Sequence, residues 1–401
     1  MLRTIATALA ATAPAGLAQA QDAEEALTVI HAGWLLAVPG EAPLEQQSIL
    51  VRGERIEGIQ AGYVTPDGAT VIDLSDDYVM PGFIDSHVHL QSELGPGRRF
   101  NAFTHSASDL AFDGAANART TLLAGFTTVQ DVGGNFEASL ALRDAIDDGD
   151  VAGPRMRIAG SAVTPTGGHA DANGFSLDVL HMFASETACN GPAQCREAVR
   201  TLIRGGADVI KITATGGVLS QQGRGLEAHF TDAEMKSIAD TAHSLGLKVM
   251  AHAHGARGIE AAARAGIDSI EHGTYLDEAA ARAMKDNGTV LVPTLMAFKG
   301  VTERLGQGIY TPVVEAKIRE VADTARVFMG RALRWGVPIA FGTDAGVFGH
   351  GRNAGEFALM VEQGMSHRDA FASATTNAAR VLGLENEIGR LAAGYSADII
   401  A

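Results

Sequence analysis

The sequence predicts an α/β protein, a (β/α)8 (TIM) barrel with a small β-sandwich domain built from N- and C-terminal segments. Two observations lead to this fold class. From residue 81 onward, short apolar runs typical of buried parallel strands alternate with helical patterns, and there are eight such runs. Before that point, strand-like runs separated by Gly, Pro and Asp indicate a small β-rich module. Eight strand and helix units favour a closed barrel, whose active site lies at the C-terminal ends of the strands.

The predicted barrel occupies residues 81–384. An open doubly wound sheet is the alternative, but no Gly-x-Gly-x-x-Gly motif follows the first strand. The eight predicted strands span 82–87, 126–131, 156–161, 208–212, 248–253, 268–271, 289–293 and 337–342. The predicted helices between and after them span 115–124, 138–147, 195–204, 232–245, 256–265, 277–287 and 313–335.

The predicted small domain combines residues 21–80 with residues 385–401. Its C-terminal part contains one further strand-like run, which stops abruptly, so we expect this part of the domain to be incomplete in the sequence given. The predicted N-terminal strands span 27–38, 48–52, 55–60 and 70–74.

Composition and charge restrict the partners. The chain has 401 residues, 46% of them hydrophobic, which is enough for a large buried core. Its formal net charge is −16. This acidic balance argues against nucleic acid or an anionic membrane surface as a partner, and its ordinary explanation is solubility.

Residues 1–20 have the features of a cleavable signal peptide. Arg3 supplies the positive charge, an Ala-rich apolar stretch follows, and Ala18-Gln19-Ala20 matches a cleavage site. The segment is too short and too weakly apolar for a permanent membrane anchor. We therefore expect a periplasmic or secreted protein.

The two cysteines fit an oxidising compartment. Cys189 and Cys195 flank a turn-rich loop and are predicted to form a disulfide. A metal-binding pair is the alternative, but no His or further Cys lies beside them.

Residues able to bind metal follow several predicted strands. His87 and His89 are two residues apart, so in a strand both imidazoles point to the same side. Each of the other candidates also has an ordinary alternative. Lys211 could be a surface lysine, and Asp344 could cap a helix. The joint placement of four imidazoles, a lysine and an aspartate at one barrel mouth is hard to explain as chance; these residues are His87, His89, Lys211, His252, His272 and Asp344.

These residues lie in five motifs that resemble the metal-dependent amidohydrolase superfamily. The resemblance covers nearly the whole chain after the signal peptide. The motifs are Pro81-Gly82-Phe83-Ile84-Asp85-Ser86-His87-Val88-His89, Ile210-Lys211-Ile212, His252-Ala253-His254, Glu271-His272-Gly273 and Gly342-Thr343-Asp344-Ala345-Gly346.

The resemblance implies two divalent metal ions, with zinc expected and manganese or cobalt also compatible with the ligands. His87, His89 and Asp344 would bind one ion, and His252 and His272 the other. Lys211 would be carboxylated and bridge them, because a carbamate offers two oxygen donors where an ammonium offers none. The ions would lower the pKa of a shared water, and Asp344 would act as the catalytic acid and base in amide hydrolysis.

Finer motifs resemble the branch of Xaa-Pro dipeptidases, acyl-amino-acid carboxypeptidases and ochratoxin-hydrolysing amidohydrolases, which is related to imidazolonepropionase. This branch implies cleavage of the amide between an acyl or aminoacyl group and a C-terminal amino acid, and a homo-oligomer, with an octamer as one candidate. His169 and Arg352 are the predicted substrate contacts, with a structural role and a surface position as the respective alternatives. His254 is expected to support the metal ligands rather than to join them.

Two alternative functions remain open from the sequence. A cyclic-amide hydrolase or lactonase would use the same metal centre. A non-catalytic periplasmic binding protein would keep the barrel without turnover, although the complete set of candidate ligands counts against it.

Overall fold

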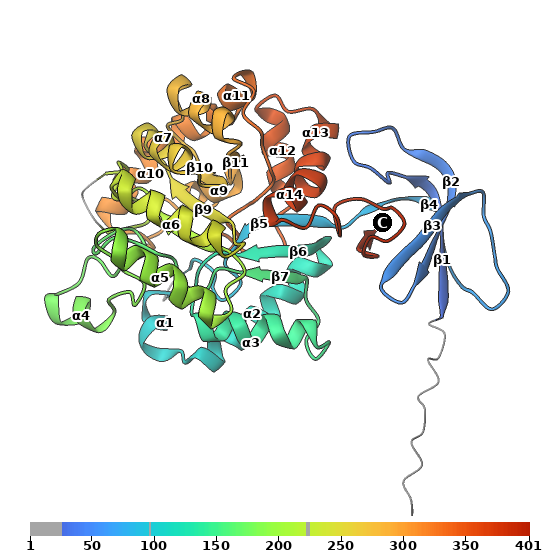
Figure 1. The fold of residues 1–401 in the computed structure, drawn as a ribbon, viewed down its shortest axis with the longest axis horizontal. Helices are drawn as coiled ribbons and strands as arrows, with labels where there is room; N and C mark the ends of the chain where they lie inside the picture. Colours follow the sequence, from blue (N-terminus) through green and yellow to red (C-terminus); the bar gives the residue numbers. More distant parts are fainter. Residues whose placement is uncertain (1–25, 96–97, 222–224) are drawn as a thin grey trace, which may run out of the picture.

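A computed structural model describes residues 26–95, 98–221 and 225–401, in which a barrel with surrounding helices lies beside a smaller sheet domain (Figure 1). The predicted signal peptide, residues 1–20, lies outside the described residues. Among the described residues, no helix has both the length and the apolar character needed to cross a membrane.

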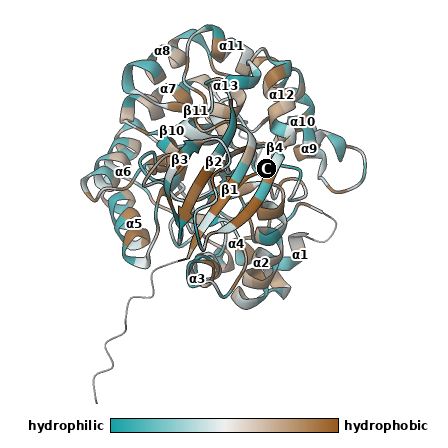
Figure 2. Ribbon diagram, turned by 90° about the vertical axis from the view of Figure 1, so that its right-hand side faces the viewer, coloured by the Kyte–Doolittle hydropathy of each residue, from teal (hydrophilic) through white to brown (hydrophobic). Residues whose placement is uncertain are grey.

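The small domain contains a five-stranded sheet in the order β12-β4-β1-β2-β3. The central strand β1 pairs antiparallel with β2 and parallel with β4. Figure 2 shows this sheet in front of the barrel, with apolar residues concentrated along β1 and β2. The strands are β1 (Leu27–Leu35), β2 (Leu44–Arg52), β3 (Arg55–Ala61), β4 (Thr70–Pro81) and β12 (Ile399–Ile400).

The C-terminal segment contributes one strand to this sheet. β12 pairs antiparallel with the end of β4. Leu391 is buried in the same cluster as Ile30, Ile49 and Val79. The Ile56 N–H donates to the carbonyl of Tyr395. β4 extends seven residues beyond its predicted end at residue 74, which brings the chain directly to the first barrel strand.

The barrel is built from seven strands and one extended segment. Two sheets, β5-β6-β7 and β11-β10-β9-β8, contain only parallel pairs. Parallel bridges join Val163 to Ile212, Leu291 to Ile339 and Val88 to Ala345, which closes the ring. The strands are β5 (Phe83–Val88), β6 (Phe126–Asp131), β7 (Arg155–Ile158), β8 (Ile210–Thr213), β9 (Val249–Ala253), β10 (Ser269–His272) and β11 (Val290–Val292).

The eighth predicted strand, residues 337–342, is held by isolated contacts instead of a regular ladder. The Leu291 N–H donates to the carbonyl of Pro338, and the Ala340 N–H donates to the carbonyl of Leu291. Pro338 has no N–H to offer. The Phe341 N–H donates to the carbonyl of Ser373, outside the barrel strands. This segment therefore occupies the strand position without a continuous ladder.

Helices cover the outside of the barrel (Figure 1). The helix predicted over 313–335 is divided, because the chain leaves helical geometry at Val327, where φ is −136°. The helices are α1 (Arg98–Thr104), α2 (Ala107–Leu123), α3 (Phe136–Asp147), α4 (Leu177–Met182), α5 (Pro192–Gly205), α6 (Asp232–Ser244), α7 (Ala256–Ala265), α8 (Glu278–Asn287), α9 (Leu295–Glu303), α10 (Pro312–Ala325), α11 (Phe328–Arg334), α12 (Gly355–Glu362), α13 (His367–Ala372) and α14 (Ala378–Leu382), with a π-helix at Ser373–Asn377.

The structure joins Cys189 to Cys195 by a disulfide. Both residues are buried, and the bond closes the loop that leads into α5. Ser185 and Glu186, which precede this loop, line the central cavity described below. The disulfide therefore fixes a segment next to the candidate site.

Candidate metal centre and active site

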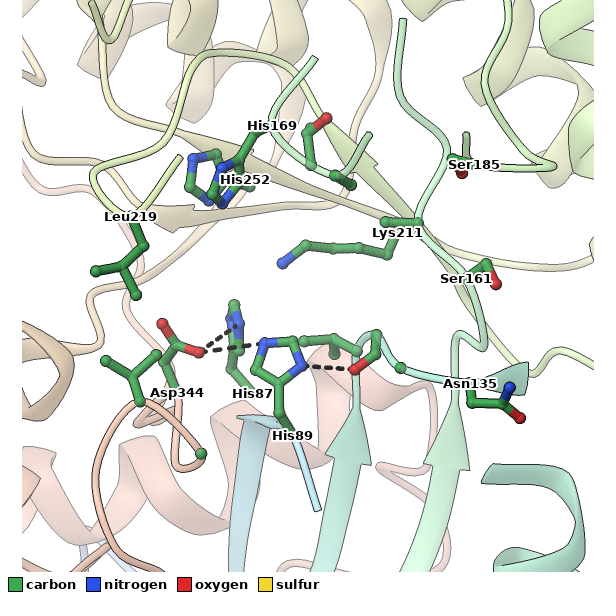
Figure 3. Close-up of a pocket in the computed structure, with 18 of the residues that line it drawn as sticks. His87, His89, Asn135, Ser161, His169, Ser185, Lys211, Leu219, His252 and Asp344 are labelled. Carbon is green, nitrogen blue, oxygen red and sulfur yellow. Dashed lines mark hydrogen bonds and ion pairs between the residues drawn. The ribbon is translucent and has the colours of Figure 1, made fainter. Parts of the chain in front are cut away.

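A cavity of about 1150 Å³ lies at the C-terminal ends of the barrel strands. All six predicted metal-binding residues line it, although they are up to 257 positions apart in the chain. Figure 3 shows Lys211 extending into the cavity between the His169 and His252 rings and the His87, His89 and Asp344 side chains. The lining residues of the predicted ligand set are His87, His89, Lys211, His252, His272 and Asp344.

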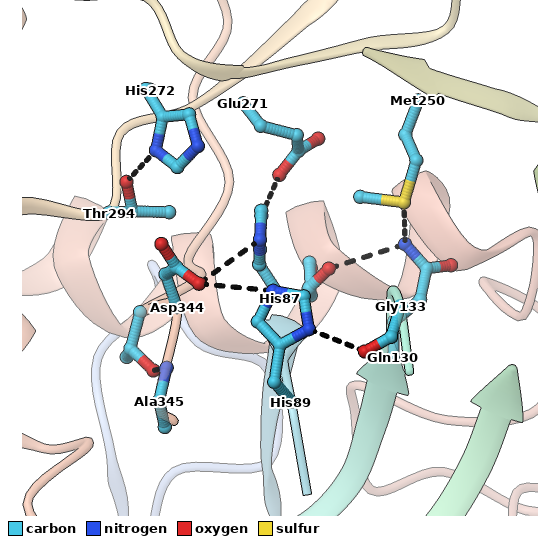
Figure 4. Close-up of polar contacts among 12 residues, drawn as sticks. His87, His89, Gln130, Gly133, Met250, Glu271, His272, Thr294, Asp344 and Ala345 are labelled. Carbon is cyan, nitrogen blue, oxygen red and sulfur yellow. Dashed lines mark hydrogen bonds and ion pairs between the residues drawn. The ribbon is translucent and has the colours of Figure 1, made fainter. Parts of the chain in front are cut away.

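His87 and His89 direct one nitrogen each toward Asp344. The Asp344 Oδ1 atom lies 3.5 Å from His87 Nε2 and 3.2 Å from His89 Nε2. The opposite nitrogens are occupied, because His87 Nδ1 lies 2.7 Å from Glu271 Oε2 and His89 Nδ1 lies 2.7 Å from the Gly133 carbonyl (Figure 4). Donation from Nδ1 leaves a lone pair on each Nε2. Two lone pairs and a carboxylate oxygen thus converge, which fits a bound cation.

A second group of imidazoles lies beside the first. The His252 and His272 rings are 4.7 Å apart, and the His87 and His272 rings are 5.4 Å apart. His272 Nδ1 lies 2.6 Å from the Thr294 hydroxyl. The candidate ligand atoms of His252, His254 and His272 lie within 4.8 Å of one another. His254, expected only to support the ligands, is thus close enough to be considered with them.

Lys211 is the one ammonium among these imidazoles. Its side chain is buried, with 4% of the residue exposed, and it makes no hydrogen bond or ion pair with another described residue. Burial lowers the pKa of Lys211, while the carboxylates of Glu271 and Asp344 act in the opposite direction. An unmodified ammonium at this position would repel a bound cation.

The backbone is strained at the same place. His272 (φ 72°), Thr294 (φ 49°) and Asp344 (φ 60°) are in the left-handed region, which L-residues other than Gly rarely adopt. Only one other non-glycine residue in the described ranges has a positive φ. Such conformations cost about 1–3 kcal/mol each and concentrate at functional sites. Here the strained residues are two candidate ligands, His272 and Asp344, and Thr294, which contacts His272.

The sequence profile of the amidohydrolase family matches residues 78–401. The chain belongs to the amidohydrolase family. It is 33% identical over 402 residues to an ochratoxinase from Aspergillus niger, covering 94% of this chain and 81% of that protein. It is also 29% identical over 378 residues to an imidazolonepropionase from Rhizorhabdus wittichii, covering 83% of this chain and 81% of that protein. The crystal structure of a Xaa-Pro dipeptidase with bound methionine in the active site superimposes with a TM-score of 0.88 and 38% identity, covering 94% and 93% of the two chains.

These findings confirm the predicted fold class and the predicted branch of the amidohydrolase superfamily. They also show that the chain is a hydrolase acting on amide bonds. The interpretation as a non-catalytic binding protein is therefore not retained.

The two predicted substrate contacts of this amidohydrolase differ in position. His169 lines the cavity, and its ring stacks on His252 at 4.3 Å. Burial lowers the pKa of His169 to about 3, so its imidazole is neutral. Arg352 is outside the cavity lining, and its guanidinium pairs with Glu303 at 3.1 Å on the surface. A substrate role for Arg352 stays a prediction, and its position gives that role no support.

Several residues that orient the candidate ligands were not predicted from the sequence. Glu271 was noted only as part of the motif around His272, yet it contacts His87 from a different strand. The sequence feature that could have identified Glu271 is a carboxylate inside an otherwise apolar strand. Asp85 is buried and accepts hydrogen bonds from the Thr343 and His87 N–H groups and the Thr343 hydroxyl. It links β5 to the segment that carries Asp344.

Proposed function

We propose that this amidohydrolase cleaves the amide bond between an acyl or aminoacyl group and a C-terminal amino acid. The observation that carries the proposal is the convergence of four imidazoles, a lysine and an aspartate on one cavity at the strand ends. The similarity to a Xaa-Pro dipeptidase supports this substrate class, because that name refers to an aminoacyl group joined to proline, and the similarity to an ochratoxinase makes ochratoxin a candidate substrate.

The donor set fits two divalent cations. His87, His89 and Asp344 would hold one, and His252 and His272 the other, with His254 as an additional candidate. Zinc is the metal we propose for these nitrogen and oxygen donors. When bound, such ions would acidify a water molecule and polarise the carbonyl of the scissile amide.

We further propose that Lys211 is carboxylated. Its lowered pKa favours the neutral amine, whose nitrogen can attack CO2 and release one proton as the carbamate forms. The product is an anion with two oxygen donors in place of a cation with none. This change removes the repulsion that an ammonium would exert on a metal ion in the cavity.

Asp344 is the residue we propose for proton transfer. Its carboxylate faces the cavity next to the His87 and His89 nitrogens. The pKa of Asp344 is lowered despite its burial, and a cation bound beside it would lower that pKa further. Asp344 is thus ionised at neutral pH, able to accept a proton from water and then to donate it to the leaving nitrogen.

Export to the periplasm or the medium and assembly into a homo-oligomer are part of the same proposal. The signal-like features of residues 1–20 and the disulfide between Cys189 and Cys195 support export. Mass spectrometry of the protein purified from culture fractions would test both cleavage after Ala20 and subunit number.

Substrate screening tests the function. The purified protein, loaded with zinc, manganese or cobalt, would be assayed against N-acyl amino acids, Xaa-Pro dipeptides and ochratoxin A, with cyclic amides and lactones as the alternative substrates. We expect turnover of compounds with a C-terminal amino acid and its loss in Asp344→Asn. The exposed Asp323→Asn is the matched control and should retain turnover. Hydrolysis of lactones or cyclic amides alone would overturn the proposed substrate class.

A further inference from the structure

Lys317 carries a buried charge that neither the fold nor the proposed chemistry explains. It lies on α10, and 6% of the residue is exposed. Its Nζ atom donates to the carbonyls of Gly217 (2.7 Å) and Ser220 (2.6 Å). None of the ion pairs in the described residues includes Lys317. A buried ammonium is costly unless it is well compensated, and the hydrogen bonds of this one all go to one short turn.

That turn forms part of the cavity wall. The Ser220 N–H donates to the Gly217 carbonyl at 3.3 Å, and the two central residues, Val218 and Leu219, both have negative φ. Both central residues line the cavity. Figure 3 shows the Leu219 side chain on the side where Asp344 lies, across the cavity from Ser161 and Ser185. The turn therefore adjoins the proposed reaction centre.

The peptide geometry of the turn directs an N–H away from Lys317. The Gly217 carbonyl and the Val218 N–H belong to one peptide unit, and the described chain contains no cis peptide. In a trans peptide the carbonyl and the N–H point in opposite directions. Because the carbonyl faces the Lys317 ammonium, the Val218 N–H faces away from it. Hydrogen bonding to an ammonium also polarises the peptide and makes this N–H a stronger donor.

The N–H groups of Val218 and Leu219 donate to no other residue within the described ranges. Adjacent backbone N–H groups without partners form anion-binding sites, and such sites capture C-terminal carboxylates in other proteins.

The cavity offers few other groups for a carboxylate. Apart from imidazoles, Lys211 is the single basic side chain in the described lining, and Arg352 lies outside it. We propose that the Gly217–Ser220 turn, held from behind by Lys317, binds the carboxylate of the substrate through the Val218 and Leu219 N–H groups. This inference rests on the proposed function, since it assigns the site for the C-terminal amino acid.

The test compares an N-acyl amino acid with its C-terminal carboxamide, which has the same shape and no charge. Val218→Pro removes one N–H, and proline suits the second position of a turn with negative φ. Val218→Ala keeps the N–H and is the matched control. Lys317→Met removes the charge at similar length.

The wild type should prefer the acid in kcat/KM. Val218→Pro and Lys317→Met should reduce this preference by about tenfold, the usual effect of losing a charge-assisted hydrogen bond.

Equal losses on the acid and the carboxamide in both variants would indicate a merely structural role and overturn the inference, as would a wild type without preference. Calorimetric titration of Asp344→Asn with the same two compounds measures the discrimination without turnover. If the wild type hydrolyses neither compound but this variant binds the acid more tightly, the proposed function fails and the carboxylate site stands. If Asp344→Asn binds the acid and the carboxamide equally, the proposed carboxylate site is wrong.

Discussion

The Nδ1 atom of His87 lies 2.7 Å from the Oε2 atom of Glu271, and both side chains are buried (Figure 4). This contact joins β5 to β10 across the barrel. Glu271 is held in turn by the Ser269 hydroxyl at 2.7 Å. A carboxylate on one imidazole nitrogen fixes the ring orientation and keeps the lone pair on the other nitrogen, which here faces Asp344.

Replacing Glu271 with Gln should weaken metal binding. The amide keeps the size of the carboxylate but removes the charge that supports the His87 ring, and loss of such a partner typically costs 10- to 100-fold in affinity. Competition with a chromophoric chelator measures the metal dissociation constants. The exposed Glu278→Gln in α8 is the control. Unchanged affinity in Glu271→Gln would show that the contact does not orient a ligand.

A second buried carboxylate should make stability depend on pH. Glu356 accepts the N–H groups of Leu295 (2.7 Å) and Met296 (2.6 Å), yet burial raises its pKa to about 8. The folded state therefore binds this proton more tightly than the unfolded state, whose glutamate pKa is about 4.3. Glu356 therefore contributes fully to the free energy of unfolding below about pH 4.3, and this contribution is lost as the pH rises toward 8.

Urea unfolding at about pH 5.5 and pH 8.5 measures this effect. The decrease in unfolding free energy between these conditions should be smaller in Glu356→Gln than in the wild type. The exposed Glu362→Gln, in the same helix, should behave as the wild type. An identical pH dependence in all three proteins would mean that Glu356 does not change its protonation on unfolding.

The disulfide should contribute to stability in spite of its short loop. Cys189 and Cys195 are six positions apart, and the chain-entropy estimate for a loop of this length is about 2 kcal/mol. Replacing both cysteines with Ala should lower the free energy of unfolding by about this amount in urea titrations. Dithiothreitol should destabilise the wild type and leave the double variant unchanged. Equal sensitivity of both proteins to the reductant would contradict this.

The residues at strand ends could be predicted because a barrel imposes a simple rule. Side chains within a residue or two of the C-terminal end of a strand can face the same mouth, however distant they are in sequence. His87, Lys211 and Asp344 follow this rule, and all three line one cavity. Strand positions were similarly predictable from apolar runs, apart from residues 337–342, where Pro338 interrupts the ladder.

Residues that act through tertiary contacts could not be predicted. Lys317 lies in a helical pattern where a lysine is ordinarily exposed, and only the folded chain brings its ammonium to the carbonyls of Gly217 and Ser220. Arg352 shows the opposite case. It follows Asp344 closely in sequence, but its pairing with Glu303 keeps it at the surface.

Metal content tests the central claim most directly. Elemental analysis of the protein after loading with zinc and removal of free metal should give two equivalents per chain. Lys211→Ala should retain one equivalent or fewer, while the surface variant Lys236→Ala should retain two. Two equivalents in Lys211→Ala, or none in the wild type, would contradict a pair of ions bridged by Lys211 at the barrel mouth.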